Sequence, residues 1–463
     1  MKVGRSASRR ITGLETEYGC LVQPSNGGIP LVQQIRDWIF DQQRYGWIDL
    51  HERDWEEPPG NGGFLFNGGR VYIDMGHIEY CTPECARVAD VVAYDRAGDR
   101  LLLQAIKALG LATRAQFFRN NIDHRTGATF GCHENYSLLR KAPLSEENVL
   151  SLLAFLTLRL LFTGSGRVGL GGHRPGPSSA GEQREAKDRV EFQISQRADF
   201  IENDFYEWVQ HNRAIINTRD EPLADPLTYR RLHLLHGDTN VLPSALYLKV
   251  GATRLVLDLL EMDALPRVVL ADAVRTLRDM SHQPSPPWRV RLVDGTEADA
   301  VELLSAFRRH AEIHLRGRDA ETDAILDLWK RVEAGLAEDL GSLVGWVDWV
   351  TKYQLLDSFR VSEGLTWSDP WMEAQDLEYH HLDPERSLGL AMAQWEGPWA
   401  ADLGSPAPLS EPPSDTRAKV RSALMARMSN GAASYEIDWH FIRLDEQQLF
   451  HLPDPFETRV PES

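Results

Sequence analysis

The chain has 463 residues, and its 50 Lys and Arg against 68 Asp and Glu give a net charge of −18. This acidic balance argues against a nucleic-acid-binding protein, because phosphate contacts need a basic face. With 42% hydrophobic and 25% charged residues, the composition is that of a globular protein, which excludes disordered, collagen-like and fibrous classes.

The cysteines and the apolar stretches indicate where the protein works. Four cysteines are too few and too scattered for a secreted disulfide scaffold, so we expect a cytoplasmic protein. The basic N-terminus is followed by no apolar run that resembles a signal peptide. The longest apolar stretch, 149–162, is shorter than the roughly 20 residues of a membrane span and contains Arg159. It predicts a buried helix and no membrane segment.

Strand and helix patterns alternate in the first part of the chain. Asn67-Gly68 is a hairpin-turn dipeptide, which predicts strands on either side of it. The expected elements are a strand at 10–19, a helix at 31–42, strands at 64–66 and 70–75, a helix at 97–109 and two strands within 115–136.

The second part of the chain is mainly helical in pattern. Apolar residues at helical spacing predict a helical layer over 298–359. Gly, Pro, Ser and charged residues mark 169–188 as a mobile surface loop. A Pro/Ser-rich patch at 405–415 precedes strand patterns at 435–444 and 449–452. We therefore expect a large domain, residues 1–404, and a small C-terminal domain, residues 405–463.

Two of the expected strands place polar side chains on one face. In the first strand, the period of two puts Gly13, Glu15 and Glu17 on one face and Leu14, Thr16 and Tyr18 on the other. In the strand at 70–75, Arg70, Tyr72 and Asp74 share a face, and Val71, Ile73 and Met75 face the core. This pattern is typical of the floor of an open active site, although a solvated outer sheet face would show it too.

Oxygen ligands are prominent near these strands. Glu79 follows soon after Asp74, and His133-Glu134 follows a later strand pattern. Carboxylates with an occasional His or Tyr oxygen suit Mg²⁺, which often binds together with nucleotide phosphates. Cys81 and Cys85 have no second close pair, so we interpret them as buried thiols and not as a zinc site.

Two further motifs leave alternatives open. Arg219 and the Arg230-Arg231-Leu232-His233 segment concentrate guanidinium groups, which grip phosphates or form structural ion pairs. Residues 164–169 match the dinucleotide pattern G-x-G-x-x-G, but a helical pattern precedes them and no helix pattern follows. We interpret them as a glycine-rich turn that borders the site.

Seven ordered motifs together resemble the Pup ligase/depupylase family. The resemblance implies an α+β fold: a glutamine-synthetase-like large domain with a concave antiparallel sheet backed by helices, and a small C-terminal domain. It also implies ATP and Mg²⁺ as cofactors. The motifs are Gly13–Gly19, Asn67–Asp74, His77–Tyr80, Gly131–Tyr136, Ser195–Ala198, Ile216–Pro222 and Tyr229–His233.

The resemblance also implies roles for single residues, matched position by position. The implied magnesium ligands are Glu15, Tyr72 and Glu79, and the motifs add Glu17, His133 and His233 to the candidate ligands. The implied nucleotide contacts are Arg70, Thr82, Arg219 and the C-terminal Trp439, and the implied catalytic aspartate is Asp74. Two positions depart from the family pattern: Ile78 replaces a proline, and Leu223 replaces a histidine that follows Asp-Glu-Pro.

The family has two opposed activities. The ligase uses ATP to phosphorylate the C-terminal Glu side chain of Pup, a small protein modifier, and a lysine of a substrate protein then attacks to form an isopeptide bond. The depupylase hydrolyses that bond. It typically carries a long insertion between the Glu-x-Glu strand and the catalytic strand, whereas only 47 residues, 20–66, lie between them here. That favours the ligase.

Other segments, such as 163–169 and 365–368, look more like the depupylase. The depupylase therefore remains the alternative. A small-molecule carboxylate–amine ligase and a non-catalytic regulator that binds Pup or a nucleotide are further alternatives.

Overall fold

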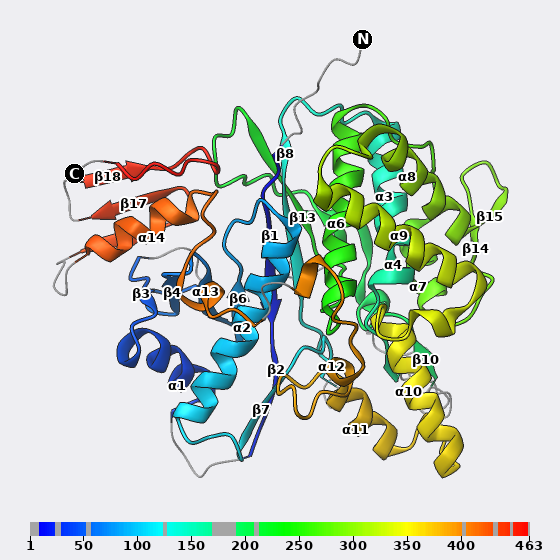
Figure 1. The fold of residues 1–463 in the computed structure, drawn as a ribbon, viewed down its shortest axis with the longest axis horizontal. Coiled ribbons are helices and arrows are strands. Elements are labelled where there is room, and N and C mark those ends of the chain that lie inside the picture. Colours follow the sequence, from blue (N-terminus) through cyan, green and yellow to red (C-terminus); the bar gives the residue numbers. More distant parts are fainter. Residues whose placement is uncertain are drawn as a thin grey trace.

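The structure, a computed structural model, describes most of the chain (Figure 1). The described residues are 9–23, 29–51, 57–123, 127–168, 191–207, 213–400, 404–428, 434–444 and 448–461. The expected loop at 169–188 lies outside them.

A nine-stranded sheet forms the centre of the molecule. Its neighbouring strands are antiparallel except for the first two, which are parallel. This arrangement confirms the α+β class expected from the sequence. In spatial order the strands are β11 (Asn203–Tyr206), β12 (Ala214–Asn217), β13 (Tyr229–Leu234), β8 (Cys132–Leu139), β1 (Thr12–Glu17), β6 (His77–Cys81), β5 (Arg70–Asp74), β4 (Gly62–Leu65) and β3 (Gly46–Ile48).

Helices cover one face of this sheet (Figure 1). Helix α2 (Val88–Ala108) lies against β1 and β6, and α6 (Pro243–Glu261) lies against β8. Helix α2 begins nine residues before the expected helix. Its first half, including Val88, Asp90 and Arg96, is buried on all sides, so no amphipathic period marks it.

The expected helical layer at 298–359 is confirmed. It consists of α8 (Ala300–Leu315), α9 (Ala320–Glu338) and the first part of α10 (Asp348–Glu363). These helices pack with α6 and α3 (Glu146–Leu158) in one apolar core. Because α3 is buried in that core, the apolar stretch at 149–162 is a core helix, as predicted. Among the described residues, no helix is long and apolar enough to cross a membrane.

Short elements complete the fold around these layers. Between 31 and 42, the expected helix is α1 (Leu31–Asp37) continued by the π-helical turn η1 (Trp38–Gln42). The other short helices are α4 (Leu160–Thr163), η2 (Ala198–Phe200), α7 (Ala273–Ser281), η3 (Leu340–Leu343), α11 (Pro370–Tyr379), α12 (Leu388–Met392), η4 (Pro398–Ala400) and α13 (Ala407–Ser410). The strand pairs outside the main sheet are β2 (Gly19–Val22) with β7 (Ala115–Phe118), β9 (Arg167–Val168) with β10 (Phe192–Gln193), and β14 (Arg289–Arg291) with β15 (Glu297–Asp299).

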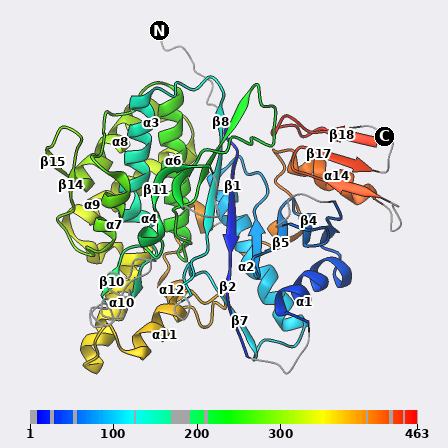
Figure 2. The same ribbon diagram turned by 180° about the vertical axis from the view of Figure 1, so that it is seen from behind.

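The C-terminal residues form a separate small unit beside β4 (Figures 1 and 2). It contains α14 (Ala418–Arg427) and a sheet of β16 (Tyr435–Ile437), β17 (Phe441–Leu444) and β18 (Gln448–His451). Its apolar residues, among them Leu424 and Ile442, pack together with Phe64 of β4. The domain boundary at 404/405 stays a prediction.

Candidate active site

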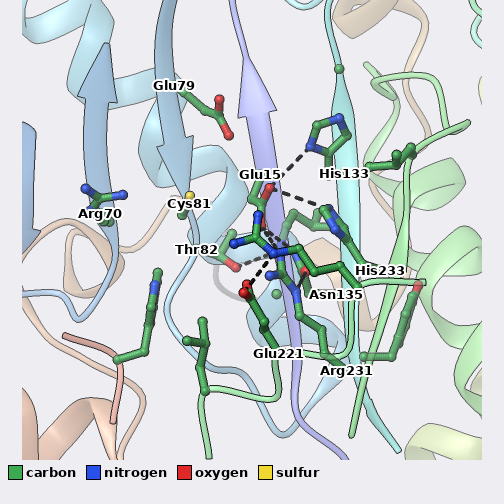
Figure 3. A pocket seen from close by; sticks show the side chains of 18 of the residues that line it. Glu15, Arg70, Glu79, Cys81, Thr82, His133, Asn135, Glu221, Arg231 and His233 are labelled. Carbon is green, nitrogen blue, oxygen red and sulfur yellow. Dashed lines mark hydrogen bonds and ion pairs between the residues drawn. The ribbon is translucent and has the colours of Figure 1, made fainter. Parts of the chain in front are cut away.

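A cleft of about 970 Å³ lies against β1, β5, β6, β8 and β13 and extends to the C-terminal unit (Figure 3). The structure brings all the predicted site residues to its wall. They are Glu15, Glu17, Arg70, Tyr72, Asp74, Glu79, Thr82, His133, Arg219, His233 and Trp439.

Strand register explains why these side chains meet. Strand β1 lies between β6 and β8, so Glu15 is paired with His133 on one side, and Glu17 with Glu79 on the other. In the next hairpin, Tyr72 is opposite Glu79. Since paired residues on neighbouring strands point to the same face, one face collects the carboxylates.

Glu15 is the centre of one group of ligand atoms. Its Oε2 lies 3.2 Å from His133 Nδ1 and 3.8 Å from His233 Nε2 (Figure 3). Burial alone would raise the pKa of Glu15, but His133, His233 and Arg231 outweigh it and hold the pKa below its usual range. Burial and the nearby Arg231 lower the pKa of His233. At neutral pH this group therefore offers the ionised Glu15 carboxylate, bound by Arg231, beside the neutral imidazole of His233.

Glu17, Asp74 and Glu79 form a second group, with ligand atoms within 4.8 Å of one another. The Tyr72 hydroxyl donates a 2.6 Å hydrogen bond to Glu79 Oε1. Burial raises the pKa of Glu79 well above its usual value, and the charges of Glu17 and Glu15 raise it further. Converging oxygen ligands whose charges repel one another are suited to a hard divalent cation such as Mg²⁺.

The other end of the cleft adjoins the C-terminal unit. The Arg70 guanidinium lies 4.5 Å from the centre of the Tyr72 ring and donates a 2.8 Å hydrogen bond to Glu57. The Trp439 ring packs on Phe64 at 5.1 Å, and the Arg421 guanidinium lies 5.0 Å from the Trp439 ring.

A buried ion-pair network anchors the C-terminal unit here. Arg421 and Arg417 both bind Glu84, at 2.6 and 2.8 Å. These two arginines hold the pKa of Glu84 at about 2 although burial opposes the shift. The C-terminal unit is thereby fixed against the sheet, with Trp439 on the cleft wall.

Sequence reasoning assigned no role to Asn135 and left Arg231 ambiguous. Asn135 Nδ2 donates to Glu15 Oε1 at 2.8 Å, and Arg231 Nη2 donates to the same atom at 3.0 Å. The signal was present, since Arg231 lies two residues before His233 on β13 and therefore shares its face. In this structure Arg231 forms an ion pair with the Glu15 carboxylate, and a structural ion pair was one of the two interpretations of this arginine.

Sequence reasoning also assigned no role to two arginines that line the same cleft. Arg197 follows β10 in a loop, and Arg213 precedes β12; both line the cleft. No local pattern could have placed them there, because each reaches the cleft through contacts with distant segments.

Two predictions about single residues are wrong. Met75 does not face the core: it is 86% exposed, because β5 ends at Asp74 and Met75-Gly76 forms the turn, with φ values of 43° and 91°. Residues 435–444 are not one strand, because they form the hairpin of β16 and β17. Trp439 is in its turn, which lets the ring reach the cleft.

The remaining motif interpretations can be checked directly. Arg219 is half exposed at the rim of the cleft and pairs with Glu221 at 2.7 Å. Cys81 and Cys85 are buried free thiols, as predicted. At residues 164–169, α4 precedes the glycines and β9 begins at Arg167, so the strand–turn–helix of a dinucleotide site is missing.

Comparison with known proteins agrees with this geometry. The family model described as "Pup-ligase protein" matches residues 10–443. The chain belongs to this family.

Relatives in the family span nearly the whole chain. The Pup–protein ligase of Acidimicrobium ferrooxidans is 34% identical over 97% of this chain and 96% of its own length. The Pup–protein ligase of Micrococcus luteus is 35% identical, with coverages of 97% and 96%. The depupylase of Acidothermus cellulolyticus is 34% identical, with coverages of 94% and 91%.

Two solved structures of the Pup ligase PafA are also similar. The crystal structure of its complex with the prokaryotic ubiquitin-like protein Pup has a TM-score of 0.80 and 30% identity, covering 97% of this chain and 90% of that one. The structure of PafA with ADP has a TM-score of 0.74 and 30% identity, with coverages of 95% and 94%.

Proposed function

We propose that this protein is an ATP-dependent Pup–protein ligase. It phosphorylates the C-terminal Glu side chain of Pup and joins that carboxyl group to a lysine of a substrate protein. One observation carries the proposal: the carboxylates of β1, β5 and β6 and the arginines of β5 and β13 meet in a single cleft. Phosphoryl transfer requires this combination, because its catalysis is mainly positioning and charge neutralisation. The Pup-bound and ADP-bound PafA structures support the partner and the nucleotide.

The two groups of ligand atoms fit Mg²⁺. Glu15, Tyr72 and Glu79 would hold it; Glu15 lies in one group with His133 and His233, and Glu79, bonded to Tyr72, lies in the other with Glu17, so both groups would supply ligands. When bound, Mg²⁺ would neutralise charge on the ATP phosphates. Arg70, Thr82, Arg219 and Trp439, which all line the cleft, would bind the nucleotide.

Asp74 would act as the general base. It lies at the end of β5, next to the exposed turn Met75-Gly76, where a lysine from another protein can approach. Its carboxylate would take a proton from the incoming ammonium, so that the amine can attack the activated carboxyl group of Pup.

The depupylase is the second candidate, because a depupylase matches this chain with the same identity as a ligase. The connection from β1 to β4 favours the ligase. It contains β2, α1, η1 and β3 in succession, so it leaves little room for the insertion typical of the depupylase. The four free cysteines agree with a cytoplasmic protein.

A paired gel assay tests the proposal. One tube contains the protein, Mg²⁺–ATP, Pup ending in Glu and an acceptor protein; the other contains a preformed Pup conjugate. The ligase predicts conjugate in the first tube with ADP formed in step. Loss of conjugate in the second tube, without matching ATP consumption, would establish the depupylase instead.

A further inference from the structure

One buried arginine in the cleft has unsatisfied donors. Arg197 is 2% exposed, and its Nε and Nη1 have no hydrogen-bond partner among the described residues. Burial lowers its pKa to about 10, and repulsion from Arg213 adds to this effect. A buried cation with unpaired donors costs free energy, so its orientation has to be enforced by the surrounding structure.

A single carboxylate enforces the path of the backbone at this arginine. Asp238 is 2% exposed and follows β13 by four residues. Its Oδ1 accepts hydrogen bonds from the Arg197 amide at 3.2 Å and from the Ser195 hydroxyl at 2.9 Å, and its Oδ2 accepts one from the Gln196 amide at 3.0 Å. The Ser195 hydroxyl oxygen also accepts from the Arg197 amide at 3.0 Å.

The same carboxylate holds the glycine-rich turn that resembles a dinucleotide motif. The Ser165 amide donates to Asp238 Oδ2 at 2.9 Å, and Gln196 Nε2 donates to the Gly166 carbonyl at 3.0 Å. Gly166 has φ +71°, and a Cβ there would lie 2.7 Å from the Phe192 ring. The turn therefore packs tightly behind the Arg197 loop, and Asp238 joins the two segments.

We propose that Asp238 is a positioning residue that holds the Arg197 guanidinium toward the reacting anionic group. This proposal rests on the proposed function, because the anion is the Pup carboxyl group as it is phosphorylated. Asp238 itself does not touch the substrate. It fixes the loop, so that the Arg197 guanidinium is already oriented toward the charge that develops during the reaction. A displacement of about 1 Å at this position would lower turnover.

A double-mutant cycle tests this. Asp238→Asn keeps the size but replaces one acceptor oxygen with a donor. We expect it to lower kcat about tenfold or more, with the KM for ATP within about twofold. In an Arg197→Met background we expect Asp238→Asn to cause no further loss of kcat, because the group it positions is already gone. Ser195→Ala removes one contact of the same network and should show the same pattern with a smaller loss.

Asp348→Asn is the matched control. Asp348 is also buried and accepts from the Leu242 amide, the Tyr379 hydroxyl and the Asn240 side chain, but among the described residues no hydrogen bond joins it to Ser195, Gln196 or Arg197. Equal losses from Asp238→Asn in both backgrounds, or a loss no larger than that of Asp348→Asn, would overturn the proposal.

A second measurement separates this proposal from the proposed function. Hydrogen exchange of the amides of Gln196 and Arg197 should accelerate in Asp238→Asn and stay unchanged in Asp348→Asn. Turnover is taken from whichever tube of the paired assay the wild-type protein is active in. If neither tube shows activity, the proposed function has failed, and unchanged exchange at these two amides still overturns the role of Asp238.

Discussion

The two faces of β1 carry two clusters of charged side chains, and the charges are arranged differently in the two clusters. On the helix-covered face, the carboxylates Asp95 and Asp99 each have a cation and a hydroxyl as partners. Asp95 and Asp99 of α2 each bind Arg119 at 2.6 Å. Thr16 of β1 and Tyr18, which follows the strand directly, donate to the same two carboxylates, at 3.1 and 3.0 Å. Arg96 is the second cation, 3.1 Å from Asp99, so two cations face two carboxylates and the cluster can stabilise the fold.

On the cleft face, carboxylates converge on one another. Glu17, Asp74 and Glu79 bring their oxygens within 4.8 Å, and burial with mutual repulsion raises the pKa of Glu79. Such an arrangement costs folding free energy that a bound cation can recover. The two faces of this strand therefore have different roles. Carboxylates paired with cations support the fold on the helix-covered face, and carboxylates held close to one another form the site on the cleft face.

The largest effect that we expect is on turnover, and it follows from replacing Asp74 on the cleft face with a side chain of the same size. Asp74→Asn deletes a proton acceptor, and we expect turnover to fall about 10³-fold. Nucleotide affinity and the thermal midpoint should remain close to those of the wild type. Conjugate formation and calorimetric ADP binding check this, with the exposed Asp41→Asn as control. Turnover like that of the wild type would refute the role of Asp74.

The opposite face should respond in stability instead. Arg119→Met leaves the buried Asp95 and Asp99 with Arg96 as their one remaining cation, so we expect the free energy of unfolding to fall by about 3 kcal/mol. Turnover per folded molecule should be unchanged at low temperature. Urea unfolding measures the loss, and the exposed Arg114→Met should show none. A variant as stable as the wild type would remove the distinction between the two faces.

A smaller effect should follow from Glu15→Ala. Because this change removes a candidate ligand oxygen and the partner of His133, we expect the apparent affinity for magnesium in the presence of ATP to fall about tenfold. A magnesium titration of ATP turnover measures it. Asn135→Ala, which only removes a donor to Glu15, should cause a smaller shift in the same direction. An unchanged magnesium dependence in Glu15→Ala would count against its role as a ligand.

The smallest effect that we expect has the opposite sign. Glu79→Gln relieves repulsion from Glu17 and Glu15, so without metal at pH 7 the protein should become more stable by about 1 kcal/mol. Thermal stabilisation by Mg²⁺–ATP should shrink at the same time. Denaturant unfolding with and without Mg²⁺–ATP measures both. A loss of stability would show that favourable contacts of Glu79 in the folded protein outweigh the repulsion from Glu17 and Glu15.

Glu84→Gln is the matched comparison, five residues along the chain. Because Glu84 is paired with Arg417 and Arg421, its pKa is lowered to about 2, and the variant should lose stability. In the wild type this contribution is complete above the unfolded pKa near 4.5 and disappears as the pH falls toward 2. The acid sensitivity in that window should weaken in Glu84→Gln.

Local patterns predicted the two faces of β1 well. The period of two separates Glu15 and Glu17 from Thr16, and no distant contact is needed to read it. The same rule failed one residue beyond β5, because Met75 takes a positive φ in a tight turn, a conformation that methionine seldom adopts. The rule therefore holds only as far as the strand does.

Other site residues could not be predicted, because their positions depend on tertiary contacts. Arg197 lies in a loop that hydrogen bonds from distant segments hold, among them those to Asp238, which also binds the turn at Ser165. Trp439 reaches it from a hairpin whose place is set by the buried pairs of Glu84. Motif resemblance identified Trp439, but the sequence alone contains no signal for the contacts that place these residues.

The position of β1 in the sheet has a consequence for how the protein is made. This strand is synthesised before its partners in the sheet, since both of its edges are filled by later strands, β6 and then β8. The ion pair between Glu15 and Arg231 joins residues 216 positions apart. At about 5–20 residues per second, synthesis leaves β1 without part of its sheet for on the order of ten seconds or more. Until β6 and then β8 have been made, the unpaired edges of β1 are sites where a chaperone can bind or a neighbouring nascent chain can mispair.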